Sequence, residues 1–434
     1  MIDRNGTTNS LTYDILGRTT TLTVGAHGGT ASTTLTYSYD LANRLTQAHD
    51  PTWGTLTNTW DDFDALTSQT TPHGTVTYQY DREGRRTAMT ATGKPAVTYA
   101  YDAANRVTSL GNGSVTIGVT YDANSRLQKL SLPGATQSYS YDLAGETTGI
   151  TYAKGATTLG SLLYAYDADG NHVSEAGSFA RATIPAAASG AYNADNEQTS
   201  WHGASLSYDA EGQLISDGTS TFAWDGRHNL RSITGTPSAT FGYDPEERRT
   251  TRTVGGASRS YLYDGSNAVQ ELSGTTPTAQ LFTGGVDEAL ARVDAQGTHA
   301  LLTDGLGSVI AVTDGTGSLT TQYTYGPFGA TTASGSTTSN SSQFAGREND
   351  GDGLYFNRAR YYDPNRGRFL SQDPAGIGAR SANLYTYVGN NPTDAIDPSG
   401  RFAQILVGAA AGCIVGGAAN ALGGWLSAAM SGNK

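Results

Sequence analysis

A short phrase returns at regular intervals through the first two thirds of this 434-residue chain: an aromatic residue, then Asp, then a tight turn. Clear copies are Tyr80-Asp81-Arg82-Glu83-Gly84-Arg85 and Tyr101-Asp102-Ala103-Ala104-Asn105-Arg106. From Tyr13 to Tyr263 the mean spacing is about 21 residues. A period of this size indicates a repeat architecture. The thirteen aromatic positions are Tyr13, Tyr39, Trp60, Tyr80, Tyr101, Tyr121, Tyr141, Tyr166, Tyr192, Tyr208, Trp224, Tyr243 and Tyr263.

Each repeat has the pattern of one β-hairpin. The run Val97-Thr98-Tyr99-Ala100-Tyr101 alternates β-branched and aromatic residues with smaller ones, which predicts a strand. The Asp that follows can bond its own backbone two residues on, and the later Gly or Asn tolerates a left-handed conformation. A second strand, such as Arg106-Val107-Thr108-Ser109-Leu110, comes next. Because one hairpin is marginally stable in water, we expect the hairpins to pair edge to edge into a long sheet.

The repeated Tyr-Asp pairs are interpreted as structural. We expect each Asp to cap its turn, each Tyr to pack against its counterpart in the next repeat, and each Arg to pair with a neighbouring Asp. The alternative is a ladder of sugar-binding or catalytic carboxylates.

Composition narrows the function classes. Only 37% of residues are hydrophobic and 55 are Gly, which suits strands that bury one face of a large sheet around a polar or water-filled interior. The net charge of −12 argues against nucleic-acid binding by this sheet. A single Cys, Cys413, excludes intrachain disulfides and Cys-based zinc sites. The seven His are scattered, so we predict no metal site and no cofactor: His27, His49, His73, His172, His202, His228 and His299.

The N-terminus carries no apolar signal region. The first repeat begins by residue 11 with no cap before it, although the end repeats of such arrays are normally atypical. We therefore expect the sequence to be a piece of a longer protein.

After about residue 290 the rhythm changes, and a dense block without repeats runs from Phe344 to Gly400. Its motifs, in order, are Gly353-Leu354-Tyr355, Arg358-Ala359-Arg360-Tyr361-Tyr362-Asp363-Pro364, Gly367-Arg368-Phe369-Leu370-Ser371-Gln372-Asp373-Pro374 and Asp397-Pro398-Ser399-Gly400. This ordered set closely resembles the repeat-associated core of RHS (rearrangement hot spot) proteins. The upstream hairpins resemble YD repeats, so the resemblance covers essentially residues 11–400.

The resemblance implies an all-β fold. In this family, which includes bacterial polymorphic toxins, the C components of insecticidal toxin complexes and teneurins, YD-repeat hairpins spiral into a large hollow β-shell. The core closes one end of the shell as a plug. We therefore expect a repeat shell over 1–290, the RHS core with its plug and protease motif over 291–400, and the start of a C-terminal cargo over 401–434.

The resemblance also implies a reaction. In the bacterial toxins the shell encloses a C-terminal toxin and separates from it by self-cleavage just after the Asp-Pro-x-Gly motif. Asp373 and Asp397 match the two carboxylates of an aspartyl-type reaction, and Arg360 matches the arginine that assists. Two carboxyl groups held close share a proton, so that one activates water and the other donates to the scissile carbonyl. The alternative for each Asp is a turn residue before Pro.

The expected cleavage site consists of Gly400, Arg401 and Phe402, with the cut between Arg401 and Phe402. The family usually has Leu where this chain has Arg401. The pocket for the residue before the cut is expected to be apolar, and a buried unpaired Arg would be costly there. The sequence therefore predicts a cut that is slow, shifted or lost.

Asp350 and Asp352 resemble a fragment of a calcium-binding loop. The series of oxygen ligands is too short for an EF-hand, so we interpret the segment as a Gly-rich turn.

The last part of the chain is apolar. Residues 402–432 contain no charge, and 405–426 is long enough to span a bilayer. Gly408, Gly412 and Gly416 have the spacing of close helix packing. The alternative is a soluble Gly/Ala-rich helix or linker that opens the cargo. The segment is too short for a folded toxin domain, so the cargo either continues further or is a short membrane-active peptide.

Three functions fit these observations. The first is a toxin shell, secreted or at the cell surface through a specialised route, that encapsulates and releases its own C-terminal cargo. Its partners would be that cargo, a secretion-machine spike, an immunity protein or a surface glycan. The second is a YD-repeat surface module that binds carbohydrate or a partner cell without self-cleavage. An inert filament fits less well, because the end block resembles a cap.

Overall fold

The computed structural model describes residues 2–376, 382–401 and 404–405. Phe402 and nearly all of the predicted apolar segment 405–426 lie outside these residues. Within them we find no helix with the length and apolar character of a membrane span.

The first part of the chain forms one antiparallel sheet of sixteen strands, each paired with its neighbours in sequence. This arrangement confirms the predicted edge-to-edge pairing of hairpins. The strands are β1 (Ser10–Tyr13), β2 (Thr19–Val24), β3 (Thr33–Tyr39), β4 (Leu45–Asp50), β5 (Gly54–Trp60), β6 (Leu66–Thr71), β7 (Gly74–Tyr80), β8 (Arg86–Ala91), β9 (Val97–Tyr101), β10 (Val107–Gly111), β11 (Thr116–Tyr121), β12 (Leu127–Leu132), β13 (Ala135–Tyr141), β14 (Thr147–Lys154), β15 (Thr157–Tyr166) and β16 (His172–Ala176).

Two further sheets continue the array. A three-stranded sheet contains β17 (Gly190–Tyr192), β18 (Gln198–Trp201) and β19 (Ala204–Ser205). A fourteen-stranded sheet follows, again in sequence order: β20 (Ser207–Tyr208), β21 (Leu214–Ser216), β22 (Thr221–Trp224), β23 (Leu230–Thr234), β24 (Ala239–Tyr243), β25 (Arg249–Val254), β26 (Ala257–Asp264), β27 (Asn267–Ser273), β28 (Thr276–Thr283), β29 (Ala289–Asp294), β30 (Gly297–Thr303), β31 (Val309–Thr313), β32 (Leu319–Tyr325) and β33 (Thr331–Gly335). The expected domain boundary after residue 290 falls within β29.

The Tyr-Asp turns fix the register between hairpins. The carboxylate of Asp102 accepts the N–H groups of Ala104 and Arg106, each at 2.9 Å, which confirms the predicted Asp-capped turn. Arg106 forms an ion pair with Asp102 of its own turn and lies 4.5 Å over the ring of Tyr121 in the next repeat. Tyr121 donates its hydroxyl to the carbonyl of Val107. The ring therefore packs under an arginine of the previous repeat, where the sequence predicted a contact between tyrosines.

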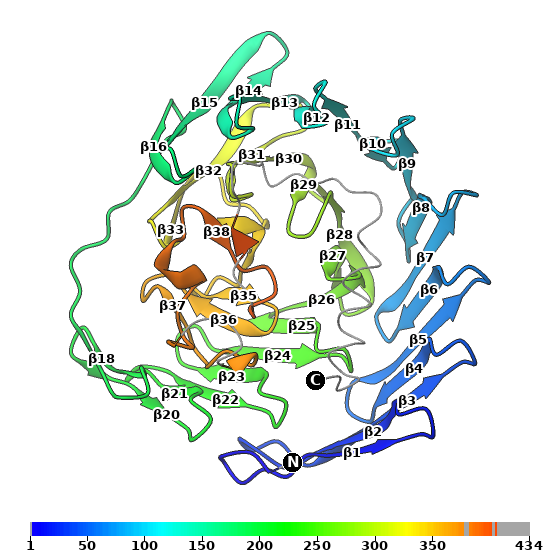
Figure 1. Ribbon diagram of the computed structural model, residues 1–434, viewed down its shortest axis with the longest axis vertical. Coiled ribbons are helices and arrows are strands. Elements are labelled where there is room, and N and C mark those ends of the chain that lie inside the picture. The colour runs from blue at the N-terminus through cyan, green and yellow to red at the C-terminus, as the bar shows by residue number, and fades with distance from the viewer. Residues whose placement is uncertain (1, 377–381, 402–403, 406–434) are drawn as a thin grey trace.

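The sheet spirals, so that the second turn of the chain lies inside the first (Figure 1). Asn5 hydrogen-bonds Asp209, 204 residues further on, where the second turn begins. Side chains then join the two turns along their length: Trp53 donates to the hydroxyl of Thr250 and Tyr152 donates to the carbonyl of Thr303. Apolar residues of both turns share one core cluster.

The outer and inner turns of the spiral differ in how many of their side chains are buried. The outer strand β3 alternates exposed and buried residues, whereas all five residues of the inner strand β31 are buried. Inner strands face the outer sheet on one side and the end block on the other. The predicted one-sided burial therefore holds for the outer turn, and the inner turn departs from it because two layers cover it.

A plug fills the inside of the second turn (Figure 1). Its elements are η1 (Phe344–Gly346), β34 (Glu348–Asn349), β35 (Tyr355–Asn357), β36 (Arg360–Asp363), β37 (Arg368–Phe369), η3 (Val388–Asn390), β38 (Ala395–Ile396) and β39 (Gln404–Ile405). Tyr362 and Tyr387 stack at 4.3 Å in its aromatic centre. The second turn of the spiral, β20–β33, forms the inner wall around the plug. There the ring of Phe241 packs 5.0 Å from Tyr361.

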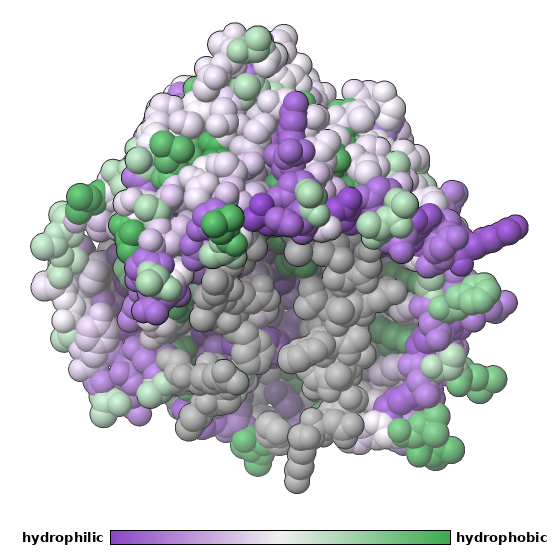
Figure 2. Space-filling view, turned by 45° about the horizontal axis from the view of Figure 1, so that its top comes forward, coloured by the Kyte–Doolittle hydropathy of each residue, from purple (hydrophilic) through white to green (hydrophobic). Residues whose placement is uncertain are grey.

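The outer surface is mainly polar, with hydrophobic side chains scattered singly over the face shown in Figure 2. Fully exposed apolar residues occur at the tips of Tyr-Asp turns, such as Leu41 and Leu143. The architecture is therefore an all-β spiral shell with a core plug.

Candidate active site

The site is built on the hairpin that joins β35 and β36. Arg358 adopts a left-handed backbone (φ 53°) at the turn, which reverses the chain within two residues. Arg360 then begins β36 and is buried. The hairpin belongs to the plug, so its position depends on the aromatic packing beneath it.

Four consecutive residues of this hairpin hold the four carbonyls of the Asp-Pro-Ser-Gly motif in order. The donors Asn357, Arg358, Ala359 and Arg360 bond the carbonyls of Asp397, Pro398, Ser399 and Gly400, respectively. The first contact is 3.0 Å and the third is 3.2 Å. The fit is close: a Cβ on Gly400 would lie 2.1 Å from the carbonyl oxygen of Asn357. The φ of 68° favours glycine at the last position of the motif, and the close approach of Asn357 leaves no room for a Cβ there.

The three residues predicted as catalytic meet at one guanidinium group. Nη2 of Arg360 lies 2.9 Å from Oδ2 of Asp373 and 3.2 Å from Oδ2 of Asp397. All three side chains are at most 8% exposed. Nη1 of Arg360 also donates to the carbonyl of Leu384 at 2.9 Å, and the guanidinium lies 3.5 Å over the ring of Phe369.

Burial and nearby positive charge act in opposite directions on the pKa of Asp373. Burial raises the pKa of Asp373, and Arg360 and Arg401 partly oppose that rise. Burial also lowers the pKa of Arg360, while the two carboxylates favour its charged form. Asp397 has a different set of partners: its Oδ1 accepts the hydroxyl of Ser399 at 3.2 Å and the N–H of Arg401 at 3.1 Å.

Arg401 departs from the environment expected for it. Its side chain is 34% exposed, and Nη2 lies 3.5 Å from a carboxylate oxygen of Glu247. Arg401 is therefore neither buried nor unpaired, because the motif leads the chain to the polar turn between β24 and β25. Phe402 lies outside the described residues, so the cut at Arg401–Phe402 stays a prediction.

Asp350 docks the plug against the inner strands, and Asp352 caps the turn beside it. Asp350 is buried and accepts hydrogen bonds from Arg249 and, at 2.6 Å, from Arg252 of the inner wall. Oδ1 of Asp352 accepts the N–H of Leu354, and burial raises the pKa of this carboxyl to about 6. In the part of the chain described here, no cluster of His, Cys, Asp and Glu has the composition of a metal site. Sequence reasoning missed the ion-pairing role of Asp350, because Arg249 is 101 residues away.

Two protein families match this chain. The family described as teneurin YD-shell matches residues 135–393, and the family described as RHS repeat matches residues 60–96. The tRNA3(Ser)-specific nuclease WapA of Bacillus spizizenii is 33% identical over 232 residues, which are 50% of this chain and 10% of that protein. The double-stranded DNA deaminase toxin A of Burkholderia cenocepacia is 27% identical over 346 residues, which are 69% of this chain and 23% of that protein.

A solved structure shares the fold. The crystal structure of TcdB2-TccC3 superposes with a TM-score of 0.72 at 18% identity, over 92% of this chain and 27% of that chain. The present chain thus spans between a tenth and about a quarter of the length of these relatives.

Proposed function

Because this chain belongs to the teneurin YD-shell family, we propose that it is the closing part of a toxin shell that cuts its own backbone to free a C-terminal effector. The cut lies between Arg401 and Phe402. Asp373 and Asp397 act as the acid–base pair and Arg360 holds them together.

One observation carries the proposal: the same nitrogen of Arg360 contacts both carboxylates, while Nε of this arginine donates to the carbonyl of Gly400. A guanidinium has a planar fork of donors that suits several oxygen acceptors at once. It therefore ties the acid–base pair to the residue that precedes Arg401. A surface ion pair would not place two buried carboxylates against a chain segment of fixed conformation.

The reaction is hydrolysis of one peptide bond. Protonated Asp373 donates a hydrogen bond to the carbonyl oxygen of Arg401, and ionised Asp397 takes a proton from water as the water oxygen attacks the carbonyl carbon. The tetrahedral intermediate then collapses: the C–N bond breaks, and the amine of Phe402 leaves with a proton from the pair. The pKa values of such a pair are shared properties of both carboxyls. Since the substrate is tethered, one turnover is enough.

The partners of Arg401 support a cut after this residue. Its guanidinium is partly exposed and lies beside Glu247, so the arginine needs no apolar pocket. Its N–H donates to Asp397. The expected cut at Arg401–Phe402 is therefore proposed without the loss of rate that burial would impose.

The proposed cleavage serves to release the cargo. The relatives carry the names of a tRNA-specific nuclease and a DNA deaminase toxin, two unrelated chemistries on similar shells. We assign to this chain the shared part: containment and release of an effector that differs between members. Export through a specialised route, docking to a secretion spike and binding of the freed toxin by an immunity protein follow from this assignment. For residues 405–426 we propose contact with a membrane, because this stretch is apolar and long enough to span a bilayer.

The test is the N-terminal sequence of the small fragment. In freshly synthesised chain, a fragment that begins at Phe402 is expected, and Asp373→Asn and Asp397→Asn should each leave the chain intact. Asp363→Asn is the matched control, because Asp363 forms an ion pair with Arg366 in the same plug without touching the motif. Cleavage that persists in both active-site variants would refute the assignment.

The surface-binding alternative gains no specific support from the tyrosines of the Tyr-Asp turns. Tyr101, for example, lies under Arg85 and donates its hydroxyl to the carbonyl of Arg86. The arginine covers one face of the ring, and the hydroxyl is already engaged within the sheet.

A further inference from the structure

We infer that Asp287 and Arg358 form a clamp between the shell wall and the motif, so that self-cleavage is conditional on the plug being docked in the wall. This inference rests on the proposed function. Asp287 comes from the loop between β28 and β29, whereas Arg358 comes from the plug. Arg358 bonds Asp287 and the backbone carbonyls of Ser266 and Pro398. Both clamp residues therefore act by positioning the motif.

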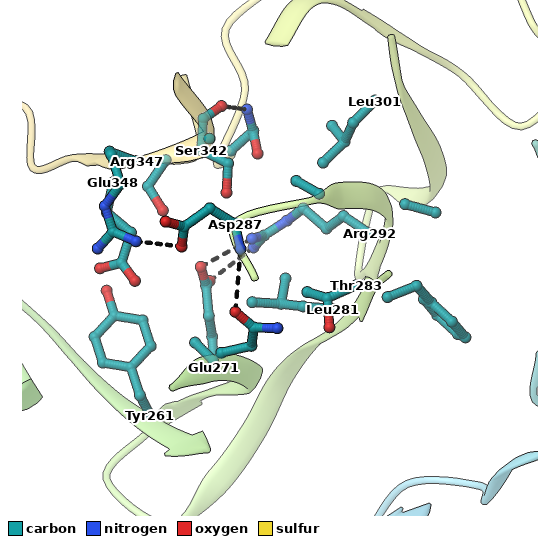
Figure 3. A pocket seen from close by; sticks show the side chains of 18 of the residues that line it. Tyr261, Glu271, Leu281, Thr283, Asp287, Arg292, Leu301, Ser342, Arg347 and Glu348 are labelled. Atoms are coloured by element: carbon teal, nitrogen blue, oxygen red, sulfur yellow. Dashed lines mark hydrogen bonds and ion pairs between the residues drawn. The ribbon is translucent and has the colours of Figure 1, made fainter. Parts of the chain in front are cut away.

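Asp287 is the anchor on the wall. Its side chain is 6% exposed and accepts both terminal nitrogens of Arg358, at 3.0 and 2.6 Å. It also accepts a hydrogen bond from Arg347 of the plug, and its own N–H donates to the side chain of Asn267 at 3.3 Å. Asp287 lines a small pocket together with Glu271, Arg292 and Arg347 (Figure 3). Hydrogen bonds and ion pairs from two plug arginines hold this carboxylate in place.

Arg358 links the wall to the Asp-Pro-Ser-Gly motif. Nη1, one of the two nitrogens that bond Asp287, also donates to the carbonyl of Pro398. Nη2 donates to the carbonyl of Ser266 in the wall at 3.3 Å. A single planar group thus contacts the wall and the residue next to Asp397. Lysine has no such fork, so it can keep the charge beside Asp287 but not the whole set of contacts.

The link matters because the motif is short and stiff. Pro398 lies between Asp397 and Ser399, whose carbonyls are held by the neighbours of Arg358 in the hairpin. A shift of Pro398 therefore moves the Asp397 carboxylate relative to Asp373. Misplacement by about 1 Å can cost about a hundredfold in rate.

The clamp makes release follow assembly. Asp287 and Arg358 are 71 residues apart in the sequence, so they meet only when the plug docks. Before docking, the carbonyl of Pro398 lacks its wall-anchored donor. A shell that is incomplete in the β28–β29 region therefore keeps its cargo attached. Cleavage begins once wall and plug are joined.

The experiment follows two quantities in Asp287→Asn and Arg358→Lys. The first is the rate of cleavage after cell-free synthesis of the full chain, as a function of pH. The second, measured in the uncleaved Asp373→Asn background, is hydrogen exchange of a peptide that covers 395–401. Arg358→Lys keeps a cation beside Asp287 and serves if Asp287→Asn fails to fold. Asp363→Asn is the control.

We expect cleavage to slow by about a hundredfold in both variants, with the pH profile unmoved and exchange of 395–401 accelerated. The control should retain wild-type rate and protection. If no chain cleaves, yet exchange accelerates in the clamp variants alone, the clamp stands and the proposed self-cleavage fails. Wild-type protection of 395–401 in the folded clamp variants, or wild-type cleavage rates, would overturn the inference.

Discussion

Arg360 donates from Nε to the carbonyl of Gly400, forty residues further along the chain. The same guanidinium contacts Asp373 and Asp397. One buried cation therefore fixes both the acid–base pair and the end of the motif that leads to the proposed cut.

Removing the cation should change the pH dependence as well as the rate. Arg360 lowers the pKa of Asp373 against the rise caused by burial. In Arg360→Gln that opposition is lost, so the pKa of Asp373 rises and its protonated form persists to higher pH. We expect residual cleavage, slower by about a thousandfold, with its limb on the alkaline side displaced upward. A pH–rate profile of the variant measures this, and an unchanged limb would show that Arg360 does not set the charge of the pair.

No side chain should be tolerated at Gly400, the glycine that ends the motif. In Gly400→Ala the new Cβ would collide with the carbonyl of Asn357, so the motif should leave its cradle and cleavage should fall below detection. Gly389→Ala is the control, because Gly389 also has positive φ (65°) but open space around its Cβ position. Circular dichroism should show that both variants fold. Cleavage of Gly400→Ala at the rate of the control would contradict the geometry.

The charge at position 401 should matter through its neighbours. Arg401→Glu places a negative charge beside Glu247 and near Asp373, and we expect cleavage to slow by about tenfold, or about 1.4 kcal/mol in activation free energy. Adding Glu247→Lys should restore part of the rate. Arg401→Leu should cleave nearly as fast as wild type, since the exposed pair contributes at most about 1 kcal/mol. Time courses of the four chains on gels give the comparison, and no recovery in the double variant would exclude a role for Glu247.

The docking ion pair should dominate the stability of the plug. Asp350→Asn weakens compensation of the buried Arg249, and we expect a loss of about 3 kcal/mol in the free energy of unfolding. Asp102→Asn, in a partly exposed turn of the outer wall, should cost no more than about 1 kcal/mol. Denaturant titration of both chains tests the contrast. Equal losses would mean that the plug does not depend on this contact.

Stability should fall from acid to neutral pH. Burial raises the pKa of Glu288 from 4.5 to about 7. Because its folded pKa is the higher one, its contribution is fully present below pH 4.5 and is lost as pH rises through about 7, up to about 3 kcal/mol over the window. Glu288→Gln should flatten this part of the profile. Melting temperatures from pH 4 to pH 8 measure it, and parallel profiles would contradict the assignment.

Local features were predictable from the sequence. The Asp-capped turns follow from Asp, Gly and Asn at fixed offsets, and the ordered motifs of the end block indicated Arg360, Asp373 and Asp397 through resemblance. These signals are contained within a few residues of the chain or within one ordered set of motifs.

Long-range contacts were not predictable. Asp287 lies in a loop without the Tyr-Asp phrase, and its pairing with Arg358 depends on how the second turn of the spiral meets the plug. The same holds for Glu247 beside Arg401. Continuous burial of β31 required knowing that two layers would cover it.

The most direct measurement is the intact mass of the shell fragment after synthesis in heavy-oxygen water. We expect a wild-type fragment that ends at Arg401 with one heavy oxygen in its new carboxyl group, and an intact Asp373→Asn chain. A wild-type chain of full length, or a fragment without the heavy oxygen, would contradict water-mediated self-cleavage by this carboxylate pair.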